Sequence, residues 1–194
     1  MKTHKNPELR GSSVVKASDV KKPTKAAPKF GAPAEKKAPV CELQGKKWVV
    51  EYHENNPNIS ISDTNSKQAV YVFRCVRSTI KVSGKVNSII LDNCKRVALV
   101  FDDVISSVEI INSQGAQVQV MGKCPTVSID KTDGCQVFLS KESTTADIIT
   151  AKSSEMNICI PKADGDFSEH AIPEQFRTKW DGKSLVTQCT DINA

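Results

Sequence analysis

The chain has 194 residues, of which 39% are hydrophobic and only 5% aromatic, and a formal net charge of +5. This length suits one domain of ordinary size plus an appendage, and it is sufficient to bury a core. The charge is uneven, because residues 1–40 contain ten Lys or Arg against three acidic residues, whereas residues 41–194 contain 17 against 19. That near-neutral balance argues against nucleic-acid binding by residues 41–194. No run of eighteen apolar residues and no signal-like segment occurs, so we expect a cytoplasmic protein without membrane contact.

Residues 1–40 interleave proline with Lys, Ala and Ser and contain few large apolar side chains. This composition predicts an extended, solvated linker, followed by one folded domain over residues 41–194. The lysine pairs Lys21-Lys22 and Lys36-Lys37 either keep this linker open or form a polybasic site for a partner.

The seven cysteines are an odd number, with no Cys-x-x-Cys pair and no histidine at ligand spacing. We therefore expect reduced thiols, no disulfide framework, no metal site and no cofactor. Cys75 and Cys94 lie nineteen residues apart, and we interpret them as small residues that stack at corresponding turns.

Apolar residues recur at a nearly fixed interval in two columns that share one period. Steps of nineteen residues align Leu91, Ile110 and Ile129 in the first column, which we expect Ile149 to continue after twenty. The second column consists of Ile80, Leu99, Val118, Val137 and Ile158. Toward the N-terminus, an interval of twenty residues aligns Val50 and Tyr52 with Val70 and Val72.

Each repeat therefore consists of two short strands with alternating apolar residues, separated by polar turns. One such unit cannot bury its apolar face alone, whereas stacking about six units at roughly 4.8 Å makes a parallel β-helix with an aliphatic interior. An antiparallel sandwich of about twelve short strands is the competing fold, but it would not require a constant interval between equivalent residues. We expect an all-β parallel β-helix.

The turns between strands form two further columns. One edge of the β-helix is expected to carry Arg74, Asn93, Asn112 and Lys131. The other edge is expected to carry Ser83-Gly84-Lys85, Asp102-Asp103, Gly122-Lys123 and Ser140-Lys141. Asp102 and Asp103 could be paired catalytic carboxylates, but adjacent residues at a strand end usually point apart, which favours a solvated turn. Since no nucleophile, phosphate-loop or metalloprotease motif occurs either, we expect that the protein is not an enzyme.

Residues 161–194 break the period and concentrate aromatic residues, including Phe176 and Trp180, before an alternating strand at Leu185–Thr190. The ends of a β-helix expose strand edges that must be covered. From periodicity alone, this segment either folds back as a cap or crosses to a second copy, because the two have the same local chemistry.

Several segments resemble the C-terminal region of the cyclase-associated proteins, which regulate actin. The resemblance covers about residues 42–194 and is carried by Gly45–Trp48, Leu99–Asp103, Val118–Lys123, Lys131–Cys135, Leu139–Lys141, Ala151–Asn157 and Pro173–Phe176. In addition, Met1–Pro7 resembles the last part of this family's WH2 actin-binding module.

The resemblance implies a right-handed parallel β-helix that forms a homodimer by exchanging a C-terminal β-hairpin. The exchanged segment would place Phe176, Trp180, Leu185, Val186, Thr187 and Cys189 at the dimer interface. It also implies binding to actin monomers, preferably with ADP bound, and faster exchange of ADP for ATP. Outward turn residues are then the expected contacts, namely Lys85, Asn112, Ser113, Lys131, Thr132, Asp133, Lys141 and the chain's last residues to Ala194.

Two other functions remain open at this point. The same architecture occurs in tubulin cofactor C and related GTPase-activating proteins, which supply an arginine from a Gln-x-Arg signature. Arg74, Arg77 and Arg96 each lack a glutamine two residues earlier, which favours a surface role for Arg74. Alternatively, the β-helix is a dimerising scaffold and the N-terminal tail carries the activity.

Overall fold

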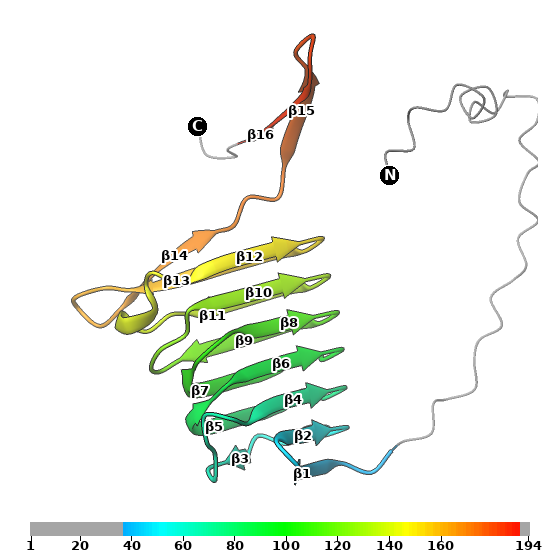
Figure 1. Cartoon of the computed structure of the whole chain (residues 1–194), viewed down its shortest axis with the longest axis vertical. Helices are drawn as coiled ribbons and strands as arrows, with labels where there is room; N and C mark the ends of the chain where they lie inside the picture. The colour runs from blue at the N-terminus through cyan, green and yellow to red at the C-terminus, as the bar shows by residue number, and fades with distance from the viewer. Residues whose placement is uncertain (1–36, 191–194) are drawn as a thin grey trace, which may run out of the picture. The chain divides into compact units, whose positions relative to one another are not determined.

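Two parallel sheets face each other across the core of the computed structural model, which describes residues 37–190 (Figure 1). The chain passes from one sheet to the other in every repeat, so consecutive repeats stack as coils of a parallel β-solenoid. The expected fold is therefore confirmed, and the antiparallel sandwich is not formed.

The first sheet contains one strand from each of six coils and one additional strand at its N-terminal end. In spatial order it consists of β1 (Val40–Gln44), β2 (Lys47–Glu51), β4 (Ala69–Phe73), β6 (Ser88–Asp92), β8 (Val108–Ile111), β10 (Thr126–Asp130) and β12 (Asp147–Ala151). Only β1 runs antiparallel to its neighbour, to which it is joined through the turn at Gly45 and Lys46.

The second sheet contains the other strand of each coil. In spatial order it consists of β3 (Ile59–Ile61), β5 (Thr79–Val86), β7 (Ala98–Val104), β9 (Gln114–Val120), β11 (Asp133–Phe138), β13 (Ser154–Pro161) and β14 (Phe167–Ala171). The last strand, β14, pairs antiparallel with β13 and covers the edge of this sheet. A one-turn 3₁₀ helix, η4 (Lys141–Ser143), lies between β11 and β12.

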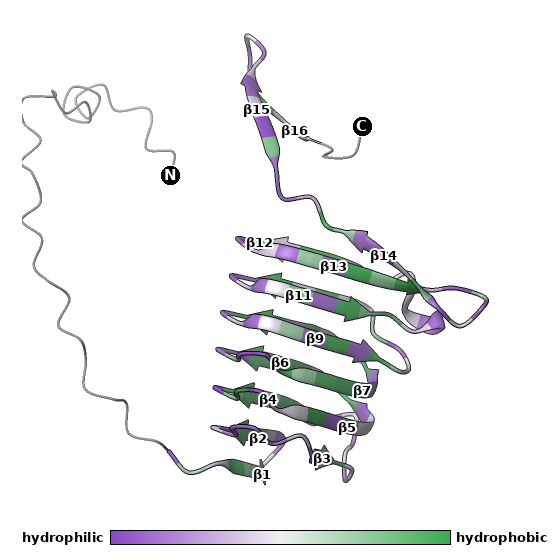
Figure 2. Ribbon diagram, turned by 180° about the vertical axis from the view of Figure 1, so that it is seen from behind, coloured by the Kyte–Doolittle hydropathy of each residue, from purple (hydrophilic) through white to green (hydrophobic). Residues whose placement is uncertain are grey.

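The core consists of aliphatic side chains stacked in columns, as the period predicts. Leu91 pairs with Ile110 and Ile110 with Ile129 in the first sheet, and all three are completely buried. In the second sheet the pairing runs through Ile80, Leu99, Val118, Val137 and Ile158. The alternation of hydrophobic and hydrophilic residues along these strands is visible in Figure 2. Stacking of like residues from coil to coil therefore fixes the register.

Two predicted alignments at the ends of the first column are wrong. Val72 pairs with Val50 rather than Tyr52, which follows β2 with a φ of 57°. Ile129 pairs with Thr150, and Val127 pairs with Ile148, which packs against the core. Ile149 instead faces outward and is 55% exposed. The actual interval at both ends is longer than the predicted one, because these coils contain extra turn residues.

A separate sheet follows the solenoid and consists only of β15 (Phe176–Trp180) and β16 (Leu185–Cys189). The two strands form an antiparallel hairpin, and every residue in them is exposed. The predicted terminal strand is thus confirmed. The sequence left open whether residues 161–194 cap the solenoid or cross to a second copy. In the structure β14 caps the second sheet, whereas β15 and β16 pair only with each other among residues 37–190.

Candidate functional site

The turns that leave the first sheet have a repeated left-handed conformation. Their first residues include Asn93, Asn112 and Lys131, with φ values of 56°, 49° and 47°. The backbone N–H of each donates to a carbonyl of the next coil, for example from Asn112 to Asp130 at 3.0 Å. Because L-residues adopt this conformation only at some cost, the hydrogen bond between coils is needed to hold it. The turns therefore present their side chains in a fixed register.

Three of the predicted contact residues are exposed on these turns. Asn112 donates through its side-chain amide to Asp92 at 3.3 Å, while the carboxylate of Asp133 accepts from the Ser154 hydroxyl at 2.7 Å. Lys131 is exposed, and its side chain has no hydrogen bond or ion pair to any residue within 37–190. Together these residues form a polar surface, which we call the turn surface, defined by Asn112, Lys131 and Asp133.

The prediction that Ser113 and Thr132 face outward is wrong. Both are buried, with exposed fractions of 5% and 2%. The Thr132 hydroxyl donates to the Asp130 carbonyl at 3.1 Å and accepts from the Ser113 backbone N–H at 3.3 Å. Ser113 repeats this arrangement with Ile111 and Cys94. These hydroxyls satisfy backbone groups inside the turns, so they are not available to a partner.

The inward positions of successive turns form one column of small residues that consists of Cys75, Cys94, Ser113, Thr132 and Ser153. This arrangement confirms the interpretation of Cys75 and Cys94 as stacked structural residues. The hydrogen bond that the Cys94 thiol donates to Cys75, together with burial, raises the pKa of Cys94, while burial alone raises the pKa of Cys135 to about 12. Thiols that stay protonated at neutral pH are weak nucleophiles.

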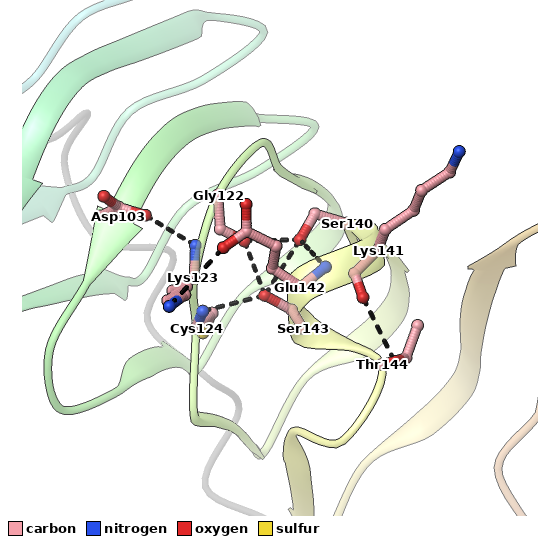
Figure 3. Close-up of polar contacts among 9 residues, drawn as sticks. All are labelled: Asp103, Gly122, Lys123, Cys124, Ser140, Lys141, Glu142, Ser143 and Thr144. Carbon is pink, nitrogen blue, oxygen red and sulfur yellow. Dashed lines mark hydrogen bonds and ion pairs between the residues drawn. The ribbon is translucent and has the colours of Figure 1, made fainter.

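Lys85 and Lys141 lie at the opposite edge of the coils, where the chain returns to the first sheet. Lys141 begins η4, and Figure 3 shows its side chain directed away from the neighbouring polar residues. Within this group, Ser143 accepts from the Cys124 N–H at 2.9 Å and donates to the Gly122 carbonyl at 2.8 Å. These bonds fix η4 to the preceding coil, and they hold Lys141 at a defined place on this edge.

A shallow depression of about 340 Å³ lies on the same edge and is lined in part by Lys85, Ile105, Lys123 and Glu142. Lys123 and Glu142 approach to 3.8 Å across it, although both side chains are largely exposed. Exposed ion pairs contribute little to the free energy of folding. The negative charge of Glu142 does, however, offset the positive charge of Lys123 in the depression. The structure therefore places the predicted contact residues in two groups on opposite edges, with Lys85 and Lys141 in one and the turn surface in the other.

Asp102 and Asp103 do not form a paired carboxylate site. The Asp102 carboxylate accepts from the Gly84 N–H of the preceding coil at 2.7 Å, and the Asp103 carboxylate accepts from the Lys123 N–H of the following coil at 2.7 Å. Both groups thus link neighbouring coils. They lie within β7 and are half-buried, so the predicted solvated turn is wrong, although their roles are structural. Among residues 37–190, no three His, Cys, Asp or Glu side chains are grouped so that they could hold a metal ion.

The hairpin places most of the predicted interface residues on one face. Phe176 lies opposite Cys189, Trp180 opposite Leu185, and Thr178 opposite Thr187. Directly paired residues share a face of the sheet, so this face carries every predicted interface residue except Val186, which belongs to the other face. Phe176, Trp180 and Leu185 are 63%, 65% and 71% exposed. Ala194 lies outside the described residues.

These features define the class of the protein as a parallel β-solenoid whose turns are held by hydrogen bonds between coils and whose C-terminal hairpin forms a sheet of its own within residues 37–190. None of the described helices is long and apolar enough to cross a membrane. The sequence model of the family described as "Adenylate cyclase associated (CAP) C terminal" matches residues 37–192. The chain belongs to this family of adenylyl cyclase-associated proteins.

Individual relatives support the same family. Adenylyl cyclase-associated protein 1 of Bos taurus is 54% identical over 193 residues, which span 99% of this chain and 41% of that protein. Adenylyl cyclase-associated protein 2 of Homo sapiens is 53% identical over 195 residues, which span 100% of this chain and 40% of that protein. This chain thus spans about two fifths of the length of these relatives.

A solved structure agrees with the fold. The crystal structure of cyclase-associated protein from Cryptosporidium parvum has a TM-score of 0.76 and 38% sequence identity, and the match covers 79% of this chain and 96% of that one. Both the predicted resemblance and the solenoid architecture are therefore confirmed.

Proposed function

We propose that this chain binds actin monomers, prefers their ADP-bound form, and promotes exchange of ADP for ATP without chemistry of its own. The observation that supports this proposal is membership, over nearly the whole chain, in the family whose resemblance implied actin regulation. It also agrees with the expectation that the protein is not an enzyme. The buried thiols of Cys94 and Cys135 and the hydrogen-bonded carboxylates of Asp102 and Asp103 all have structural roles instead.

The mechanism that we propose is differential binding. A rigid surface that fits actin better when its nucleotide cleft is loosened will increase the population of that state, and nucleotide then leaves faster. The turn surface suits this role, because its side chains are exposed while hydrogen bonds between coils hold its backbone. Little conformational entropy is lost when such a surface binds.

Replacing Lys131 and Asp133 by alanine should weaken the effect of the protein on nucleotide release from ADP-actin. Two exposed polar contacts of about 0.7 kcal/mol each would raise the half-maximal concentration about tenfold. Thr132 is left unchanged, because its substitution would disturb the buried column of hydroxyls. The measurement is release of a labelled nucleotide from ADP-actin at increasing protein concentration.

Lys67→Ala is the matched control, since Lys67 is also exposed but lies in a different turn. Unchanged release with Lys131→Ala/Asp133→Ala would remove the turn surface from the proposed site. The Lys85 and Lys141 edge would then be tested in the same way.

The partner proposal includes a homodimer formed by exchange of the β15–β16 hairpin. An isolated two-stranded hairpin is at best marginally stable in water, and this one has a face with Phe176, Trp180 and Leu185 exposed. Packing of that face against a second copy would remove these side chains from water. Of the two alternatives left by the sequence, the exchanged strand is therefore the one that we propose.

The alternative of a GTPase-activating module receives no support from the position of Arg74. The guanidinium carbon of Arg74 lies 5.1 Å from the centroid of the Phe73 ring. A cation held against an aromatic ring is partly committed to that contact, whereas an arginine that enters a GTPase site must extend freely from the surface.

A further inference from the structure

A second row of turn residues borders a groove that the proposed actin contacts do not use. The row consists of Arg77, Arg96, Gly115, Gly134 and Glu155, all with φ between 45° and 75°. Across from it, paired residues of the second sheet form the other wall, which consists of Thr79, Ala98, Gln117, Gln136 and Asn157. We call the space between the two rows the arginine groove.

The arginine groove contains two depressions that adjoin each other. The first has a volume of about 270 Å³ and is lined in part by Arg77, Arg96 and Ala98, and the second has a volume of about 250 Å³ and is lined in part by Gly134 and Glu155. Gly115 and Gln117 line both of them. The depressions therefore form one groove that crosses the strands along the direction in which the coils stack.

The two glycines keep the middle of this groove open. A Cβ added at Gly115 would lie 3.5 Å from the Cγ of Arg96, and one added at Gly134 would lie 3.6 Å from the Cα of Gly115. Any larger side chain at these positions would occupy the groove floor.

Charge is distributed unequally between the ends of the groove. At one end, Arg77 donates through Nε to Asn55 at 2.7 Å, while the Arg96 side chain has no hydrogen bond or ion pair within the described part of the chain. At the other end, the Glu155 side chain is exposed, and the Glu174 carboxylate accepts from the Glu155 backbone N–H. A ligand that matches this groove therefore has negative charge at one end and positive charge at the other.

The length and chemistry of the groove match an extended peptide. Arg96 and Glu155 are three coils apart, which is about 14 Å at the spacing of neighbouring strands, or roughly four residues of extended chain. Between them, the Gln117 amide can both donate to and accept from a peptide group. The Gln136 amide already donates to the Glu169 carboxylate at 3.2 Å, so its carbonyl oxygen is the group that can accept from a peptide N–H. Arginine binds carboxylates with two parallel hydrogen bonds. Arg77 and Arg96 would therefore give specificity for the acidic residues of the peptide.

We propose that the arginine groove binds an extended segment of a partner protein in which acidic and basic residues lie about four residues apart. This inference does not rest on the actin proposal. The groove is formed by different side chains from the turn surface, and its occupant is defined by its own charge pattern.

The test is titration of the ¹⁵N-labelled full chain with the synthetic peptide Glu-Glu-Ser-Ser-Ser-Lys-Lys, followed by NMR. A second peptide, in which glutamine replaces every charged residue, measures the contribution of charge. We expect saturable shifts at the amides of Gly115, Gly134 and Gln117 with the charged peptide, and at least tenfold weaker binding of the neutral one.

Two variants separate the groove from general electrostatic attraction. Arg77→Gln/Arg96→Gln should weaken binding at least tenfold, whereas Lys46→Gln/Lys67→Gln, which removes the same charge elsewhere, should leave it unchanged. Ala98→Phe keeps the charge and fills the first depression, so it should also weaken binding. The dispersion of the remaining amide resonances checks that each variant is folded.

Shifts spread over other basic surfaces would overturn the proposal. So would equal binding of the neutral peptide, or equal binding by folded Arg77→Gln/Arg96→Gln.

Discussion

The side chain of Thr132 illustrates how much the direction of one residue matters in this fold. Its neighbours Lys131 and Asp133 face solvent, whereas its hydroxyl bonds to backbone groups of two turns. Alternation from inward to outward therefore continues through the turn as well as the strands. A polar residue in a turn of this solenoid belongs to the interior when it occupies the same column as Cys75 and Cys94.

Thr132→Val should destabilise the protein by about 1–3 kcal/mol. Valine has nearly the same shape, but it leaves the Ser113 N–H without its buried acceptor. Urea unfolding followed by circular dichroism measures the change. Thr144→Val is the matched control, because Thr144 is exposed and its hydroxyl bonds only weakly to Lys141 at 3.4 Å. Equal stability of Thr132→Val and the native protein would mean that this hydroxyl does not stabilise the turn.

At the level of elements, the central repeats are predictable and the terminal ones less so. From Leu91 to Ile129 a strict interval of nineteen residues leaves only one register. Between β10 and β12 the 3₁₀ helix lengthens the coil, and Ile148 and Ile149 are both apolar, so hydrophobicity cannot show which one faces inward. β1 was not predicted because its five residues lie outside the repeat.

The candidate site was predictable only in part, for a similar reason. The sequence shows which residues lie in turns, and this was sufficient for Asn112, Lys131 and Asp133. It does not show that a small polar residue is folded under the turn, as Ser113 is. The arginine groove was missed because its members come from five coils. Because Arg, Gly and Glu share no chemical property, their recurrence once per coil does not stand out in the sequence as a row.

The β15–β16 hairpin gives a prediction at the same level. Trp180→Ala/Leu185→Ala should convert the proposed dimer to a monomer, because these residues supply the two most exposed apolar side chains of the hairpin. Light scattering after size-exclusion chromatography measures the mass. Arg177→Ala/Lys179→Ala changes the opposite face and should leave the dimer intact. A native protein that is monomeric at all measured concentrations would disprove hairpin exchange.

For the molecule as a whole, the stack of coils implies that stability varies with position. Each inner strand bonds to two neighbours, whereas β3, at the end of the second sheet, has only three residues and, within residues 37–190, pairs only with β5. In solenoids each repeat contacts only adjacent repeats, so the end repeats can open while the centre stays folded.

Native-state hydrogen exchange should therefore be at least about tenfold faster for the amides of β3 that bond to β5 than for those of β7. β7 is the internal control, because it lies in the same sheet and pairs on both sides, with β5 and β9. Mass spectrometry of peptides that cover the two strands measures the difference. Identical exchange of β3 and β7 would show that the whole solenoid opens in one step.

The left-handed turns hold their side chains in place, and they also set a fixed spacing between equivalent side chains of successive coils. Residues from Arg74 through Asn93, Asn112 and Lys131 to Lys152 recur once per coil, at increments of about 4.8 Å. A partner with groups at another spacing can align with one coil but not with its neighbours. The spacing between the coils thus selects a partner by the distance between its binding groups, in addition to selection by charge. Inserting a single residue into one coil would change the distance between contacts without removing any of them.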